Sequence, residues 1–217
     1  MAIIKQLSEK MANMIAAGEV VDRPASVIKE LVENSIDAKA NIIKIEVNDF
    51  GLSLIRVTDN GIGMEKEDAI LAFYRHATSK ISDEGDLSHI NSLGFRGEAL
   101  PSISSVSKVL LQTKVAGKEG VEIYLEGSKK IKEGITSMNE GTIISVMELF
   151  YNTPARFKYI KSDNAEKNAI IDTFNVLAMS YPNISFKLFM DNVLIKETYG
   201  NSDMGNLLSS IYGKEIA

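Results

Sequence analysis

The sequence lacks several residue types on which common functional sites depend. It has no cysteine and no tryptophan, and its only two histidines are His76 and His89. The absence of cysteine excludes disulfides, thiolate nucleophiles and cysteine-ligated zinc, and two histidines are too few for a histidine metal cluster. No apolar run is long enough to span a bilayer, and the start, MAIIKQLSEK, lacks the apolar core of a signal peptide. We therefore expect a cytoplasmic protein with no membrane partner.

The overall composition is that of a chain able to bury a large core. It has 217 residues, of which 45% are hydrophobic, enough for one large domain or slightly more. The chain is acidic, with 24 Lys and Arg against 29 Asp and Glu and a net charge of −5. This balance argues against a protein that binds nucleic acid through its net charge alone, but it is compatible with a local basic groove.

Hydrophobic periodicity predicts helices that alternate with antiparallel strands. The predicted helices cover 8–17, 24–38, EDAILAF, the segment after LGFRG and 164–180, and the predicted strands cover 41–49, 52–60, 106–115, 120–126, 130–137, 142–149, 184–190 and 193–198. We expect an α+β fold, a two-layer sandwich in which helices cover one face of a mixed, mostly antiparallel sheet. Residues 79–92 are expected to form a mobile loop.

The end of the sequence has a different pattern. Residues 1–200 are expected to form one domain, and 201–217 are interpreted as a linker, containing Gly205, followed by the start of a truncated second domain. The alternative is a C-terminal helix that docks back on the first domain.

The stretch ELVENSIDA, residues 30–38, places an unusual set of side chains on one helix stripe. Glu30, Glu33, Asn34 and Asp37 gather opposite an apolar face. Like charges three or four residues apart destabilise a helix. A stripe with three acids, one amide and no base therefore indicates a nearby cation.

Two glycine-containing motifs add to this pattern. In DNGIG, residues 59–63, Asp59 ends a strand and two glycines follow, which would let a ligand approach the backbone closely; a plain hairpin turn is the alternative. In SLGFRGEALPSISSV, residues 92–106, a glycine loop leads into a helix N-terminus, an arrangement that suits phosphate; an ordinary capped loop is the alternative. Neither motif is specific alone.

Together the three features predict a nucleotide site with a bound metal. The carboxylate of Asp59 suits an exocyclic amine. Mg²⁺ prefers oxygen ligands and takes few protein groups beside phosphates, so the side-chain oxygen of Asn34 would suffice. One turn earlier, Glu30 could accept a proton from a water that attacks the γ-phosphate.

The motifs also resemble those of a known family. In order, IAAGEVVDRPASVIKELVENSIDA (15–38), DNGIGM (59–64), RHATSK (75–80), LGFRGEALPSISSV (93–106), GT (141–142) and LFYNTPARFK (149–158) resemble the signatures of the MutL family of DNA mismatch-repair proteins. The resemblance covers roughly residues 1–200. More distantly the chain is similar to DNA gyrase B subunits, heat-shock chaperones of the ninety-kilodalton class and histidine kinases, which implies a GHKL-type ATPase fold.

The resemblance implies site roles at matching positions. Glu30 would be the general base, Asn34 the Mg²⁺ ligand and Asp59 the acceptor of the adenine amine of ATP. The other implied nucleotide-binding positions are Ala38, Gly63, Met64, Thr78, Ser79, Lys80, Leu93, Gly94, Phe95, Arg96, Gly97, Glu98, Ala99, Leu100 and Thr142. A following domain in the family supplies a lysine to the γ-phosphate, so we expect only weak Mg²⁺-dependent ATPase activity from this chain.

The implied partners are a mismatch-recognition protein and downstream repair factors, with nucleotide-dependent homodimerisation of the full-length protein. Weak, non-specific DNA contact is expected at Arg156, Lys158 and Lys161, although such a run can simply solvate a helix. Two other functions stay open. One is a nucleotide-gated binding module with little intrinsic hydrolysis. The other is a chaperone or topoisomerase relative, which GFRGEAL and YNTPAR disfavour.

Overall fold

The structure is a computed structural model that describes residues 17–18, 20–75, 77 and 97–213. Its elements are, in chain order, α2 (Pro24–Asp37), β1 (Ile42–Asn48), η1 (Asp49–Gly51), β2 (Leu54–Asp59), α3 (Lys66–Leu71), α4 (Ala99–Ser105), β3 (Lys108–Lys114), β4 (Gly120–Glu126), β5 (Lys129–Thr136), β6 (Gly141–Met147), α5 (Pro154–Phe157), α6 (Asp163–Ser180), β7 (Ser185–Met190), β8 (Val193–Glu197) and α7 (Met204–Tyr212).

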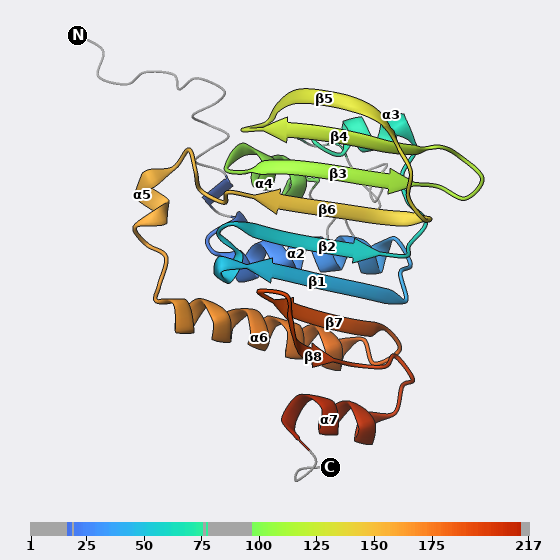
Figure 1. Ribbon diagram of the computed structural model, residues 1–217, viewed down its shortest axis with the longest axis vertical. Helices are drawn as coiled ribbons and strands as arrows, with labels where there is room; N and C mark the ends of the chain where they lie inside the picture. The colour runs from blue at the N-terminus through green and yellow to red at the C-terminus, as the bar shows by residue number, and fades with distance from the viewer. Residues whose placement is uncertain (1–16, 19, 76, 78–96, 214–217) are drawn as a thin grey trace, which may run out of the picture.

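The eight strands form one sheet in the order β5-β4-β3-β6-β2-β1-β7-β8 (Figure 1). All neighbouring pairs are antiparallel except β1 and β7, which run parallel. Helices α4, α2 and α6 pack side by side over β3 and β4, over β1 and β2, and over β7, respectively. The predicted α+β sandwich with a mixed, mostly antiparallel sheet is therefore confirmed. The helix predicted over 8–17 lies almost entirely outside the described residues.

The core lies between the sheet and these helices, because the strands alternate buried and less buried residues. Ile45 on β1 pairs with Val57 on β2, which pairs with Ile144 on β6, and Ile144 pairs with Leu111 on β3. These side chains are at most 6% exposed. Such rows, with side chains on one face at every second position of each strand, form the apolar floor beneath α2.

Helix α2 begins as the sequence predicts. Arg23 is its N-cap residue, and Pro24 occupies the first helical position, where its missing N–H is not needed. Its apolar stripe faces the sheet, with Ile28, Leu31 and Val32 at most 1% exposed. The helix therefore presents its opposite side, which carries Glu30 and Asn34, away from the core.

The C-terminal part of the described chain packs on the same core. Leu207 and Ile211 of α7 are buried and belong to the main hydrophobic cluster. Gly205, predicted to lie in a linker, is the second residue of α7, whose N-cap is Asp203. No helix of the described residues is long and apolar enough to cross a membrane. The domain boundary near residue 200 stays a prediction.

Candidate functional site

The apolar rows of the sheet change to polar residues at one end. Asp59 ends β2 and pairs with Thr142 on β6, which pairs with Thr113 on β3. All three are buried, with exposed fractions of 8%, 6% and 0%. The two threonine hydroxyls lie 3.1 Å apart. Burying a row of polar groups at the ends of three adjacent strands is costly unless each group is hydrogen-bonded. The hydrogen-bond partners of these three residues therefore belong to the candidate site.

The carboxylate of Asp59 accepts three hydrogen bonds. The backbone N–H groups of Gly61 and Thr142 donate to Oδ1 at 2.9 and 3.2 Å, and the Ser35 hydroxyl donates to Oδ2 at 2.7 Å. Burial raises the pKa of Asp59, and these three hydrogen bonds offset part of that shift. An ionised carboxylate has about four acceptor positions. One position on Oδ2 is therefore left for a further donor.

These contacts also attach the end of α2 to the sheet. Ser35, on α2, reaches Asp59 across the core, and the N–H of Ile62 donates to the carbonyl of Ala38 at 2.9 Å. Ala38 is the C-cap residue of the helix. The turn after β2 and the end of α2 therefore form one connected unit, with the predicted site residues Ala38 and Asp59 in it.

The sequence predicts that a ligand approaches the backbone closely at Gly63. In the structure, the group that approaches it closely is the backbone of Lys114. The φ of Gly63 is +69°, and a Cβ at this position would lie 2.2 Å from the carbonyl oxygen of Lys114. The next N–H, that of Met64, donates to the Thr113 hydroxyl at 2.8 Å. The glycine therefore lets the turn pack against the end of β3, beside Thr142.

On the outer stripe of α2, Glu30 and Asn34 are partly exposed, with the Glu30 side chain 24% exposed. The stripe is less uniformly acidic than the sequence analysis assumed. Lys29 lies one turn from Glu33, and their charged atoms are 3.1 Å apart. Glu33 is buried beside the Lys29 ammonium, and the same ammonium lies 3.9 Å from a carboxylate oxygen of Glu30. Glu30 and Asn34 stay the positions proposed for chemistry on the stripe.

The predicted phosphate-binding loop is described only at its end. Gly97 has a φ of +59°, and Ala99 begins α4 with Pro101 buried in its first turn. The N-cap residue of α4, Glu98, makes no side-chain capping hydrogen bond, and the first N–H groups of a helix have no acceptor within the helix. The remaining loop positions lie outside the described residues: Thr78, Ser79, Lys80, Leu93, Gly94, Phe95 and Arg96.

The residues present fit a hard cation shared with phosphates. Among the described residues there is no group of three or more His, Asp or Glu side chains that could hold a metal ion without other ligands. A Mg²⁺ ion that takes most of its ligands from phosphate and water needs only one or two protein oxygens. Asn34 offers one such oxygen on the outer stripe of α2.

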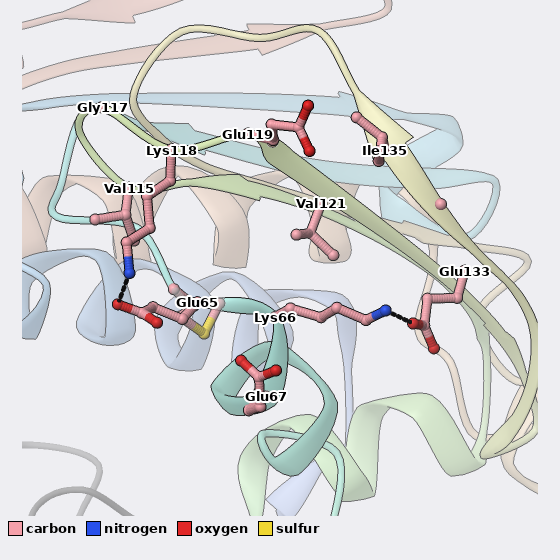
Figure 2. Close-up of a pocket in the computed structure, with 13 residues that line it drawn as sticks. Glu65, Lys66, Glu67, Val115, Gly117, Lys118, Glu119, Val121, Glu133 and Ile135 are labelled. Atoms are coloured by element: carbon pink, nitrogen blue, oxygen red, sulfur yellow. Dashed lines mark hydrogen bonds and ion pairs between the residues drawn. The ribbon is translucent and has the colours of Figure 1, made fainter.

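A hollow of about 590 Å³ lies beside this site (Figure 2). It opens between the start of α3, the β3–β4 turn and β5, and Met64 lies at its boundary. Ion pairs cross it between Glu65 and Lys118 and between Lys66 and Glu133. Its lining contains four glutamates, Glu65, Glu67, Glu119 and Glu133, against two lysines. That charge repels a triphosphate, so we do not place the nucleotide there.

The predicted basic segment lies on a different part of the molecule. Helix α5 contains Arg156, and Lys158 and Lys161 follow it as exposed residues. Burial lowers the pKa of the Arg156 guanidinium, which lies against the backbone of Gly18. Arg156 is therefore partly occupied in packing, whereas the two lysines face solvent.

Sequence reasoning missed two residues of the site, Ser35 and Thr113. Ser35 lies inside the ENSIDA motif, next to Asn34, but a helical serine is usually interpreted as a surface residue. Thr113 is the last inward-facing position of β3, and the period of two would place it in the row of Asp59 once the strand order is known. Both signals were present in the sequence, but neither identifies a partner by itself.

Comparisons with known proteins match this arrangement. The family model for histidine kinase-, DNA gyrase B- and HSP90-like ATPases matches residues 22–148. Over all of its length, the chain is 52% identical to the DNA mismatch repair protein MutL of an Exiguobacterium species and 50% identical to that of a Geobacillus species. It spans 36% and 35% of these relatives, about a third of their length.

Solved structures agree with these sequence matches. The Aquifex aeolicus MutL ATPase domain complexed with ADP is similar with a TM-score of 0.72 and 30% identity, over 89% of this chain and 70% of that one. The N-terminal domain of a DNA repair protein is similar with a TM-score of 0.78 and 31% identity, over 96% and 62%. With the polar row under α2 and the glycine turn after β2, these matches place the chain in the family of histidine kinase-, DNA gyrase B- and HSP90-like ATPases and, within it, among the MutL ATPase domains.

Proposed function

We propose that this chain binds and hydrolyses ATP as the N-terminal region of a DNA mismatch-repair protein. The observation that carries the proposal is the buried carboxylate of Asp59, which accepts three hydrogen bonds and keeps one acceptor position. The amine of adenine would donate to that position. Guanine carries a carbonyl oxygen at the corresponding place, and two facing acceptors repel, so the site favours adenine. ADP bound to the Aquifex MutL ATPase domain supports the same ligand class.

The phosphates would lie between the outer stripe of α2 and the start of α4. Backbone N–H groups from Gly97 to Leu100 would bind the phosphate oxygens, since the positive end of a helix attracts anions. Thr142 and Gly63 would shape the base pocket together with Asp59. Leu93 is proposed to bind the nucleotide, Gly94, Phe95 and Arg96 to belong with Gly97 to the phosphate-binding lid, and Thr78, Ser79 and Lys80 to border the nucleotide.

Hydrolysis needs a base for the attacking water. Glu30 is proposed to accept a proton while the water oxygen forms a bond to the γ-phosphorus, and the bond to the bridging oxygen breaks and leaves ADP. Asn34 would hold Mg²⁺ through its side-chain oxygen. When bound, Mg²⁺ neutralises charge on the phosphate oxygens.

In the full-length protein, ATP-dependent ordering of the loop and homodimerisation would couple mismatch recognition by a partner protein to downstream repair factors. Direct DNA contact by the present chain is proposed to be weak and non-specific, through Lys158 and Lys161. Such contacts lose strength steeply as salt rises, and the net charge of −5 opposes them. Retention on DNA should therefore be seen at low salt only.

Replacing Glu30 with Ala tests the catalytic part of the proposal. We expect ATP affinity, measured by calorimetry, to stay within about threefold, because Glu30 is proposed to contact the attacking water and not the adenine ring. Single-turnover hydrolysis should fall by about 10²–10⁴-fold, the usual contribution of a general base. The exposed helical acid Asp172 provides the control, and Asp172→Ala should change neither quantity.

The same experiment separates the two main functions. If the wild-type chain hydrolyses ATP above the rate without protein and Glu30→Ala keeps that rate, Glu30 is not the general base. If the wild-type chain binds ATP but shows no hydrolysis above the rate without protein, the nucleotide-gated binding module is the better description. A wild-type chain that does not bind ATP at all would exclude both.

A further inference from the structure

The N-terminal end of α2 is held by an ion pair with α6 in which the glutamate is buried and the arginine is partly exposed. The guanidinium of Arg23 donates to Oε2 of Glu166 from Nε at 3.2 Å, and its Nη2 lies 3.1 Å from the same oxygen. The Glu166 side chain is 2% exposed, and that of Arg23 is 28% exposed. The other oxygen of Glu166 accepts from the N–H of Lys161 at 3.3 Å. Both oxygens of this carboxylate are therefore used.

Arg23 is also the residue from which α2 starts. Its carbonyl accepts from the N–H groups of Ser26 and Val27, and its side chain also donates to the carbonyl of Ala165 at 3.4 Å. The position of the first turn of α2 is therefore fixed by the first turn of α6. Among the described helices, α6 is also the one against which α2 packs most extensively.

The opposite end of α2 has a separate attachment. Ser35 donates to Asp59, and the carbonyl of Ala38 accepts from the turn after β2. Glu30 and Asn34 lie between the two attachments, with Glu30 about two helical turns from Arg23. The C-terminal attachment belongs to the proposed base pocket, whereas the N-terminal attachment consists of contacts of Arg23 with α6 and of Glu166 with the N–H of Lys161.

A buried ion pair is a weak source of stability, because desolvation offsets most of its attraction and an apolar pair of similar size is often as stable. What such a pair adds is a fixed relative orientation of the two helices, because a guanidinium and a carboxylate form hydrogen bonds only in a narrow range of orientations. We propose that Arg23 and Glu166 are positioning residues for hydrolysis, which orient α2 so that Glu30 meets the attacking water. This inference rests on the proposed ATPase function.

The proposal predicts a split between catalysis and binding. Loss of the ion pair would let the first turns of α2 shift while Ser35 and Ala38 still hold its end at Asp59. A misplacement of about 1 Å in a catalytic group costs about 10²-fold in rate. ATP affinity, which depends on Asp59, should change little. A residue that only stabilises the fold would lower the amount of active protein and leave the rate per folded molecule unchanged.

The test compares Arg23→Lys, Glu166→Gln and the apolar double variant Arg23→Met with Glu166→Leu. For each we would measure thermal unfolding, ATP affinity by calorimetry and single-turnover hydrolysis at saturating ATP, per ATP-binding molecule. The control is Glu197→Gln, which removes the charge from a partly exposed pair, in which Lys187 on β7 lies 2.8 Å from Glu197 on β8. We expect hydrolysis to fall about 10- to 100-fold in the three ion-pair variants, with ATP affinity within about threefold and the control unchanged.

The double variant gives the sharpest outcome. If it is as stable as the wild type and hydrolyses ATP at the wild-type rate, the pair is only structural and the proposal is overturned. If it is stable and slow, the proposal holds. If it does not fold, Arg23→Lys decides, because that variant keeps the charge and one contact; an unchanged rate, or parallel losses in rate and affinity, would overturn the proposal. A wild-type chain without hydrolysis would instead remove the proposed function.

Discussion

Replacing Asp59 with Asn should stabilise the fold at neutral pH and weaken ATP binding. The stabilisation follows from the raised pKa of Asp59, whose main cause is burial. A carboxyl whose pKa is higher in the folded state than in the unfolded state favours folding only in its protonated form. Above the folded pKa, the ionised form costs stability. An amide in its place carries no charge, so this cost is removed.

The hydrogen bonds around Asp59 can survive the change. The amide oxygen of Asn would accept from Gly61 and Thr142, and its N–H₂ group would donate to the hydroxyl of Ser35. That hydroxyl can then donate to the carbonyl of Leu31, which is 3.2 Å away. No buried group would be left unpaired, so the variant should fold.

Binding should suffer because the remaining acceptor position disappears. The amide N–H₂ group would face the adenine amine, and a buried contact between two donors costs about 1–3 kcal/mol. This corresponds to a loss of about one to two decades in ATP affinity at ~1.4 kcal/mol per decade. Calorimetry measures the affinity, and urea unfolding measures the free energy of unfolding. Asp172→Asn, at an exposed position, should change neither.

The pH dependence checks the cause. The difference in unfolding free energy between Asp59→Asn and the wild type should shrink as the pH falls through the folded pKa, because the wild-type carboxyl then takes up its proton. A variant that is less stable at neutral pH would mean that the three hydrogen bonds outweigh burial. Unchanged ATP affinity would refute the role in adenine binding.

Replacing Gly63 with Ala should produce the largest loss of stability among these variants. The chain offers a matched control, since Gly63 and Gly117 have almost the same backbone conformation, with φ of +69° and +71°. They differ in their surroundings. A Cβ at Gly63 would lie 2.2 Å from the carbonyl oxygen of Lys114, whereas among the described residues no atom lies within 4 Å of a Cβ at Gly117.

Gly117→Ala therefore reports backbone strain alone, about 1–2 kcal/mol. In Gly63→Ala the new methyl group also overlaps the backbone of β3, and this overpacking should cost about 1–3 kcal/mol more in the free energy of unfolding. The variant should also displace Met64 from Thr113 and weaken ATP binding. Urea unfolding and calorimetry on both variants would measure the difference. Equal losses of stability in the two variants would show that the turn moves freely and that the contact with β3 does not constrain it.

The sequence contained most of the fold because its elements are defined by local periodicity. The strands alternate, α2 begins at a proline, and the β7–β8 hairpin turns at Asp191 and Asn192, both with positive φ. The pair of Lys29 and Glu33 is also local, and the uniformly acidic interpretation of the stripe was wrong because it left out Lys29. Contacts between distant elements were not accessible in this way.

The polar row of Asp59 and the ion pair of Arg23 with Glu166 show which contacts the sequence could not predict. Ser35 and Asp59 are separated by 24 positions, and Arg23 and Glu166 by 143. Spacing cannot reveal that such residues meet until the strand order and helix packing are known. Asp59 and Glu30 were predicted only because short motifs carry their chemistry, and the environment that raises the pKa of Asp59 is a product of the tertiary fold.

The parallel pairing of β1 with β7 has a consequence for synthesis on the ribosome. Ile42 pairs with Ser185, so the strand next to α2 finds one of its two neighbours only after most of the chain has been made. At about 5–20 residues per second, Glu166 follows Arg23 out of the ribosome after about 7–30 s. During that interval the side of α2 that packs against α6 has no partner from that helix. A nascent chain of this protein should therefore be most open to chaperone binding and aggregation over this window.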